Sequence, residues 1–252
     1  MNNSTVFESG RVKDFEYKVI GATLAGISHA KKNIKNQDCL GFQKNHKGVL
    51  IAVADGVGSC LEAQKGSKYA IETIKKLHDK IESGQIRANA RKKIKEFIIE
   101  DWKNKVSVSP SDYSTTLRFA IVFSNSLLLG GIGDSAIFVS INGEEQLLNR
   151  ESSPFSNITF SLTQDMDESK FEIVKIDIPF NTKNVSIFIA TDGITSELQE
   201  GKQIEFLNYL ARKVREKGDN YQVEMMEWVN SLQEKNGDDK TMLLFTAERI
   251  SS

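Results

Sequence analysis

Two apolar segments of the chain each end in Asp-Gly, and this shared ending constrains the fold more than any other feature. The segments are VLIAVADGV, residues 49–57, and VSIFIATDGI, residues 185–194. Compact apolar runs of this kind are typical of strands that are buried on both faces. Asp55 and Asp192 would then lie at the ends of buried strands, where a carboxylate is costly unless it is paired, hydrogen-bonded or bound to a metal. The glycine after each aspartate lets the backbone turn sharply.

Asp-Gly is also a common turn signal, and for either segment alone a simple turn is the plainer interpretation. Further acidic clusters favour a shared site. They occur at residues 36–38 (NQD), 133–135 (GDS) and 237–241 (GDDKT). Oxygen ligands without a His or Cys cluster select hard cations, Mg²⁺ or Mn²⁺, over zinc, and no twelve-residue EF-hand loop is present. The sequence therefore predicts a site for Mg²⁺ or Mn²⁺.

The order of apolar patterns predicts an α+β fold. Residues 1–16 are polar and aperiodic, and we expect a loose arm there. Strands are predicted at residues 17–26, 49–54, 116–123, 127–132, 136–141, 171–178, 185–190 and 241–246. Apolar residues recur at helical spacing in residues 63–81, 86–98, 204–214 and 221–232. The short connections at 124–125 and 133–134 favour antiparallel hairpins. No long linker interrupts the chain, so we expect a single domain over residues 1–252.

Charge and composition exclude several classes of partner. The formal net charge is -1, with Lys+Arg 33 against Asp+Glu 34, so neither nucleic acid nor an anionic membrane is expected to bind. The two cysteines imply no disulfide framework. The N-terminal residues lack the apolar core of a secretory signal, and the apolar runs are too short to cross a bilayer. We therefore expect a cytoplasmic protein.

Six short motifs together resemble those of one enzyme family, in its order. They are residues 28–38 (SHAKKNIKNQD), 54–59 (ADGVGS), 114–116 (STT), 131–139 (GIGDSAIFV), 190–195 (ATDGIT) and 237–241 (GDDKT). Each is weak alone, but together they span about residues 24–246. The chain resembles the PPM (type 2C) metal-dependent protein serine/threonine phosphatases, particularly the short bacterial branch. The resemblance implies a four-layer α-β-β-α sandwich of two antiparallel sheets flanked by helix pairs.

The resemblance also implies a set of site residues. The implied ligands of two core ions are Asp55, Gly56 through its carbonyl, Asp192 and Asp238. Asp55 would bridge the two ions. Asp38 would act on them through bound water, and Asp134 would help to hold a third, weaker ion. Two cations lower the pKa of a bridging water and hold the phosphate ester for in-line attack, so no covalent phosphoenzyme is needed.

The chain departs from the family pattern where the substrate phosphate is usually gripped. Many members carry an arginine five residues before the first-motif aspartate, and Asn33 stands there. Lys31, Lys32 or Lys35 could replace it as point charges, although a solvated loop explains these lysines as well. Lys32 and Lys35 are our candidate phosphate ligands. Gln37 replaces the usual glutamate.

A second departure concerns the proton donor. Some relatives have a histidine within the second motif, where this chain has Val57. His29 is the histidine that falls in a candidate site segment, and it could protonate the leaving group or hydrogen-bond the loop. Residues 150–170 occupy the place of a variable flap that influences substrate choice in the family.

These features predict hydrolysis of phosphoserine and phosphothreonine in proteins, with the substrates supplied by a Ser/Thr kinase and the enzyme acting as a monomer. Two alternatives stay open at this point. Asn33 and Gln37 favour a catalytically weak relative that binds phosphoproteins as a regulator. The missing arginine leaves open a phosphatase of small molecules.

Overall fold

The computed structural model describes residues 3–106, 109–149, 160–234 and 236–250 of the 252-residue chain. Much of the predicted flap, residues 150–159, lies outside the described residues. The strands are β1 (Ser4–Val12), β2 (Phe15–Leu24), β3 (Asp38–Lys44), β4 (Gly48–Asp55), β5 (Leu117–Phe123), β6 (Ser126–Ile132), β7 (Ala136–Ile141), β8 (Glu144–Asn149), β9 (Glu172–Asp177), β10 (Asn184–Ala190) and β11 (Lys240–Arg249). The α-helices are α1 (Ile27–Lys31), α2 (Ala63–Glu82), α3 (Arg91–Lys105), α4 (Asp192–Thr195), α5 (Gln203–Lys217) and α6 (Tyr221–Ser231).

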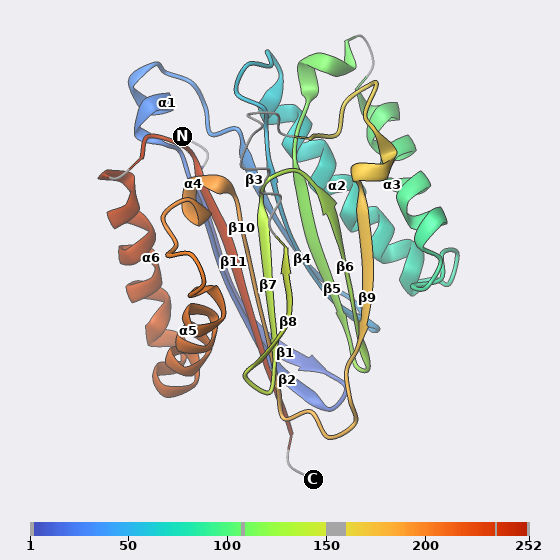
Figure 1. Ribbon diagram of the computed structural model, residues 1–252, viewed down its shortest axis with the longest axis vertical. Coiled ribbons are helices and arrows are strands. Elements are labelled where there is room, and N and C mark those ends of the chain that lie inside the picture. The colour runs from blue at the N-terminus through green and yellow to red at the C-terminus, as the bar shows by residue number, and fades with distance from the viewer. Residues whose placement is uncertain (1–2, 107–108, 150–159, 235, 251–252) are drawn as a thin grey trace.

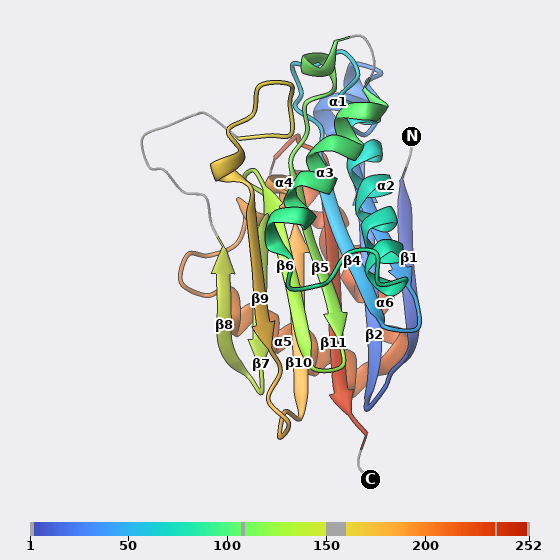
Figure 2. The ribbon, with the colours of Figure 1, turned by 90° about the vertical axis from the view of Figure 1, so that its right-hand side faces the viewer.

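The strands form two antiparallel sheets that pack face to face (Figure 1). One sheet has the order β1-β2-β11-β10-β7-β8, and the other has the order β3-β4-β5-β6-β9. Helices α2 and α3 cover the outer face of the second sheet, while α5 and α6 cover the outer face of the first (Figures 1 and 2). The predicted four-layer α-β-β-α sandwich is therefore confirmed.

Strand β4 explains why the sequence forms layers. Its alternate residues Val49, Ile51 and Val53 belong to the core between the sheets. Leu50, Ala52 and Ala54 instead pack in the layer between this sheet and α2 and α3. All six side chains are fully buried, because both faces of the strand are covered. An unbroken apolar run was thus the correct signal for a strand buried on both faces.

The expected loose arm at residues 1–16 is wrong. Residues 4–12 form β1, which pairs with β2 along its whole length from Ser4↔Thr23 to Val12↔Phe15. Most side chains of β1 are exposed or half-buried, as suits an edge strand, so the segment has no strong apolar pattern. Backbone hydrogen bonds to β2 hold this segment in place, and the polarity of its side chains does not predict such bonds.

One predicted hairpin is also wrong. Residues 127–132 and 136–141 form strands β6 and β7, but β6 pairs with β5 and β9 while β7 pairs with β8 and β10. The short connection therefore crosses from one sheet to the other. The hairpin predicted at residues 124–125 does form, between β5 and β6.

The polar pattern also concealed strands β3 and β8. Side chains of β3 are mostly half-buried, which left no clear alternation to recognise. Helix α3 begins at Arg91, five residues later than predicted, after a turn at residues 83–90.

None of the described helices is both long enough and apolar enough to cross a membrane.

Candidate metal centre

Asp55 is fixed at the end of β4 by the STT motif. The backbone N–H of Asp55 donates to the hydroxyl of Thr116 at 3.1 Å. Its carbonyl accepts from the Thr116 N–H at 2.7 Å and from the Thr115 hydroxyl at 2.8 Å. These bonds replace the sheet ladder where the strand ends, because a buried backbone group must have a partner. The carboxylate is therefore held in one place while the chain turns away through Gly56.

Asp192 begins the short helix α4, two residues after the end of β10. The glycine that follows it is required by packing. A Cβ on Gly193 would lie 1.9 Å from the carbonyl oxygen of Asp239, so only glycine allows this close approach of the two loops. The Asp-Gly sequence is thus explained here by contact between two motifs that lie far apart in the sequence.

Asp134 lies on the connection that crosses from β6 to β7. Gly133 precedes it with a φ of +106°, a backbone conformation that side chains rarely adopt. A Cβ there would also lie 2.5 Å from the Cβ of Thr116. The crossing and its glycine bring Asp134 to the same end of the sandwich as Asp55 and Asp192.

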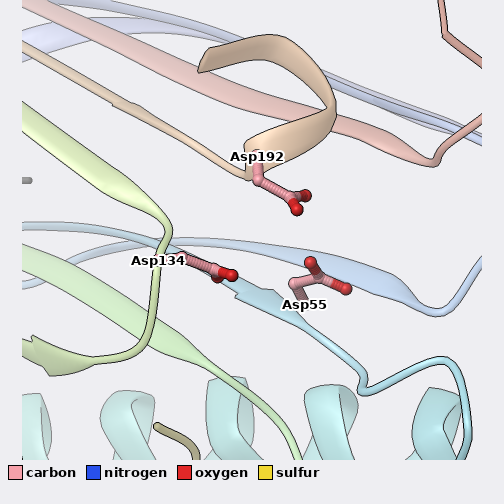
Figure 3. A group of neighbouring side chains, drawn as sticks. All are labelled: Asp55, Asp134 and Asp192. Carbon is pink, nitrogen blue, oxygen red and sulfur yellow. The ribbon is translucent and has the colours of Figure 1, made fainter. Parts of the chain in front are cut away.

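These three aspartates converge on one space. Each offers a carboxylate oxygen that lies within 4.8 Å of the others, and Figure 3 shows the side chains pointing toward one another from β4, α4 and the β6–β7 connection. They line a cavity of about 220 Å³ together with His29, Gln37, Gly56, Val57, Gly58, Thr116 and Asp238. Neither Lys nor Arg is among the described residues that line it.

The electrostatics of the site show crowded negative charge. Burial, followed by the neighbouring Asp38 and Asp192, raises the pKa of Asp55 well above its usual value. Burial and then Asp134 and Asp238 raise the pKa of Asp192 to about 6. Like charges at this separation disfavour the ionised form unless a cation offsets them. Clustered carboxylates around a small cavity whose described wall has no Lys or Arg fit a hard divalent ion such as Mg²⁺ or Mn²⁺.

The other predicted ligands lie around this group. Asp238 is an exposed residue that lines the cavity, although it is not one of the three mutually closest carboxylates. Gly56 lines the cavity as well. Asp38 is buried and accepts a hydrogen bond from the Thr191 hydroxyl at 2.9 Å. Burial and the nearby Asp239 raise the pKa of Asp38 to about 7.

His29 lines the cavity and contacts a residue that the sequence did not point to. Its Nδ1 lies 3.0 Å from a carboxylate oxygen of Asp239, which is almost fully buried. The same carboxylate accepts from the N–H of Gly26 at 2.7 Å and of Gln37 at 2.6 Å. Asp239 therefore joins the first motif to the last. In the sequence, the only signal for this role of Asp239 was its position next to Asp238 in the segment Gly237-Asp238-Asp239.

The candidate phosphate ligands are placed differently. Lys32 and Lys35 are exposed on the segment after α1, and neither lines the cavity. Asn33 lies between them, is exposed too, and has a φ of +56°. The predicted site residues that line the cavity are thus Asp55, Gly56, Asp134, Asp192, Asp238 and His29. Asp38 does not line it but pairs with Asp55 across β3 and β4, and the two lysines lie outside it.

Comparisons with known proteins identify a family for the sequence. The family model described as Protein phosphatase 2C matches residues 25–230. No curated protein matches the chain.

Several solved structures share the fold. The serine/threonine phosphatase PstP/Ppp of Mycobacterium tuberculosis superposes with a TM-score of 0.64 at 14% identity, covering 93% of this chain and 99% of that one. RsbX in complex with magnesium superposes with a TM-score of 0.60 at 16% identity, covering 96% of this chain and 100% of that one. The phosphatase Stp1 of Staphylococcus aureus superposes with a TM-score of 0.55 at 16% identity, covering 100% of this chain and 96% of that one. Since the family model matches most of the sequence, the chain belongs to the protein phosphatase 2C family of serine/threonine protein phosphatases.

Proposed function

We propose that this phosphatase hydrolyses phosphoserine and phosphothreonine in proteins with a water activated between two divalent cations, Mn²⁺ or Mg²⁺. The observation that carries the proposal is the convergence of Asp55, Asp134 and Asp192 within 4.8 Å on a cavity that has no Lys or Arg in its described wall. Two of the similar structures contain such ions, magnesium in RsbX and two manganese ions in the catalytic domain of PstP.

Each acidic residue has a proposed role. Asp55, at the end of β4, would bridge the two core ions, with the Gly56 carbonyl beside it. Asp192 and Asp238 would complete the core from the other sheet. Asp134 would contribute to a third, weaker ion. Asp38, held by Thr191, would accept hydrogen bonds from water in the site.

His29 is our candidate for the leaving-group acid. Because its Nδ1 faces Asp239, the opposite ring nitrogen Nε2 is the one that can serve the cavity. A proton donated from Nε2 would pass to the serine or threonine oxygen as the P–O bond breaks. Asp239 would hold the ring in the orientation that this transfer requires.

The phosphate-binding role of Lys32 and Lys35 also stays a proposal. Both lie on the segment that leads into Asp38, close in sequence to the cavity wall at Gln37. A phosphoprotein, supplied by a Ser/Thr kinase, could meet them at the rim. Replacement of both by alanine would then raise the KM for a phosphopeptide several-fold, and an unchanged KM would remove them from the site.

The decisive experiment measures phosphate release from a phosphothreonine peptide with added Mn²⁺. We expect Asp55→Asn and Asp192→Asn to lower kcat about 100-fold or more, because each removes a charge that the cations need. Asp219→Asn is the matched control. Asp219 is exposed and pairs with Lys18. It should retain wild-type activity.

Wild-type protein that releases no phosphate with Mn²⁺ would refute the proposal. Rapid turnover of p-nitrophenyl phosphate without turnover of the peptide would instead identify a phosphatase of small molecules.

A further inference from the structure

Two positively charged side chains are buried close to the candidate metal centre, one in each sheet. Among the described residues, Arg118 and Lys240 are the Arg and Lys residues whose side chains are buried. They are 1% and 0% exposed. Arg118 is in β5 and Lys240 opens β11. Taking a charged side chain out of water is unfavourable unless it is well paired. Their positions therefore need a reason.

Arg118 binds the connection that carries Asp134. Its Nε donates to the Ser135 carbonyl and its Nη2 donates to the Gly133 carbonyl, both at 2.8 Å. The two carbonyls flank Asp134 in the sequence, so one planar guanidinium fixes the backbone on both sides of this carboxylate. The Nη1 atom lies 3.8 Å from a carboxylate oxygen of Glu172 on β9. Such a two-pronged grip is specific to arginine.

Lys240 binds the loop that carries Asp238. Its Nζ donates to the Asp238 carbonyl at 3.0 Å, to the Asn236 carbonyl at 3.1 Å and to the Asn236 side-chain oxygen at 2.7 Å. The amide nitrogen of Asn236 donates in turn to the Gly193 carbonyl at 3.1 Å. The ammonium therefore holds the Asp238 loop directly and the start of α4, next to Asp192, through Asn236.

Neither cation lines the cavity, so neither is placed to touch a phosphate there. Each acts on backbone carbonyls beside a proposed ligand. Each also puts a positive charge near crowded carboxylates, beside a cavity whose described wall has no Lys or Arg. Outer residues that fix metal ligands commonly change metal affinity 10–100-fold when replaced.

We propose that Arg118 and Lys240 are positioning residues of the metal centre: Arg118 fixes the Asp134 loop and Lys240 fixes the Asp238 loop in the geometry that binds divalent cations. This inference rests on the proposed function, because it assigns the two residues to the same metal site.

The test is a pair of double-mutant cycles read by Mn²⁺ binding, with free Mn²⁺ measured by electron paramagnetic resonance. Arg118→Met and Lys240→Met remove the charge at similar side-chain length. Each should weaken Mn²⁺ binding about tenfold. In an Asp134→Asn background, Arg118→Met should have no further effect, whereas Lys240→Met should retain its own. In an Asp238→Asn background, Arg118→Met should retain its effect, whereas Lys240→Met should keep only the part that acts near Asp192 through Asn236.

Two further variants guard against misfolding. Arg118→Lys keeps the charge but cannot span both carbonyls, and Lys240→Gln keeps a donor without the charge, so both should bind Mn²⁺ with intermediate affinity. If the Met variants are folded and bind Mn²⁺ with wild-type affinity, this inference is wrong, whereas the proposed function stands. Losses that are equal in both Asp backgrounds would also overturn it, because general loosening would explain them. Wild-type protein that binds no Mn²⁺ would overturn the proposed function as well.

Discussion

The contact between His29, in α1, and Asp239 supports the role that we propose for this histidine. The aspartate is fixed by two backbone N–H groups and presents an oxygen to Nδ1 at 3.0 Å. His29 also lines the cavity, and its other ring nitrogen, Nε2, is the one that we propose serves the substrate. An acid is needed when the leaving group is a poor one, as a serine or threonine alkoxide is.

We therefore predict that His29→Gln separates two substrates. The kcat for a phosphothreonine peptide should fall about 100-fold, whereas that for p-nitrophenyl phosphate should fall less than about threefold, because nitrophenolate leaves without a proton. Steady-state kinetics with both substrates measure the difference. His46→Gln, at an exposed position before β4, is the control. Equal losses on both substrates would show that His29 only supports the loop.

At the scale of elements, the sequence predicted those strands whose apolar runs are buried on both faces, such as β4, β5 and β10. It missed β1, β3 and β8, because edge and half-exposed strands depend on backbone pairing. The clustering of Asp55 and Asp192 could be predicted because an aspartate at the end of a buried strand is conspicuous. Arg118 and Lys240 were overlooked, although a charge within the apolar runs TTLRFAIVF and DKTMLLF was the available signal.

Helix α2 contains a buried group that should make stability depend on pH. Among the described residues, neither ring nitrogen of the fully buried His78 has a hydrogen-bond partner. Burial lowers the pKa of His78 to about 4. The unfolded chain takes up this proton below about pH 6.5, while the folded chain resists it until about pH 4. Stability is therefore lost as the pH falls through this window, by about 3 kcal/mol at its lower end.

We predict that His78→Leu flattens this dependence. Between about pH 7 and about pH 5, the wild-type free energy of unfolding should fall by about 2 kcal/mol more than that of the variant. Urea unfolding in the presence of a chelator measures both. His46→Leu should behave like the wild type. A variant that retains the full pH dependence would assign it to other groups.

At the scale of the whole molecule, the proposed metal ligands come from both sheets. Asp55 ends β4 in one sheet, Asp192 and Asp238 flank β10 and β11 in the other, and Asp134 lies on the connection between them. Ions held by this set would join the two halves of the sandwich at one end. Binding to the folded state alone raises its stability by about 2.7 kcal/mol at a concentration of about 100 times Kd.

Mn²⁺ at that concentration should therefore raise Tm by about 5–10 °C over protein with a chelator. Thermal unfolding followed by circular dichroism measures this shift. In Asp55→Asn the rise should be less than about 2 °C, because the bridging ligand is lost. A rise of equal size in that variant would place the stabilising ions elsewhere.

The position of β11 has a consequence for fragments of the chain. This strand lies between β2 and β10, in the interior of its sheet, and Asp238 lies two residues before it. A fragment that stops after β10 therefore lacks the strand that joins β2 to β10, and it lacks Asp238 as well. Such a fragment would hold only part of the proposed ligand set, so we expect it to bind Mn²⁺ more weakly than a chain that contains β11.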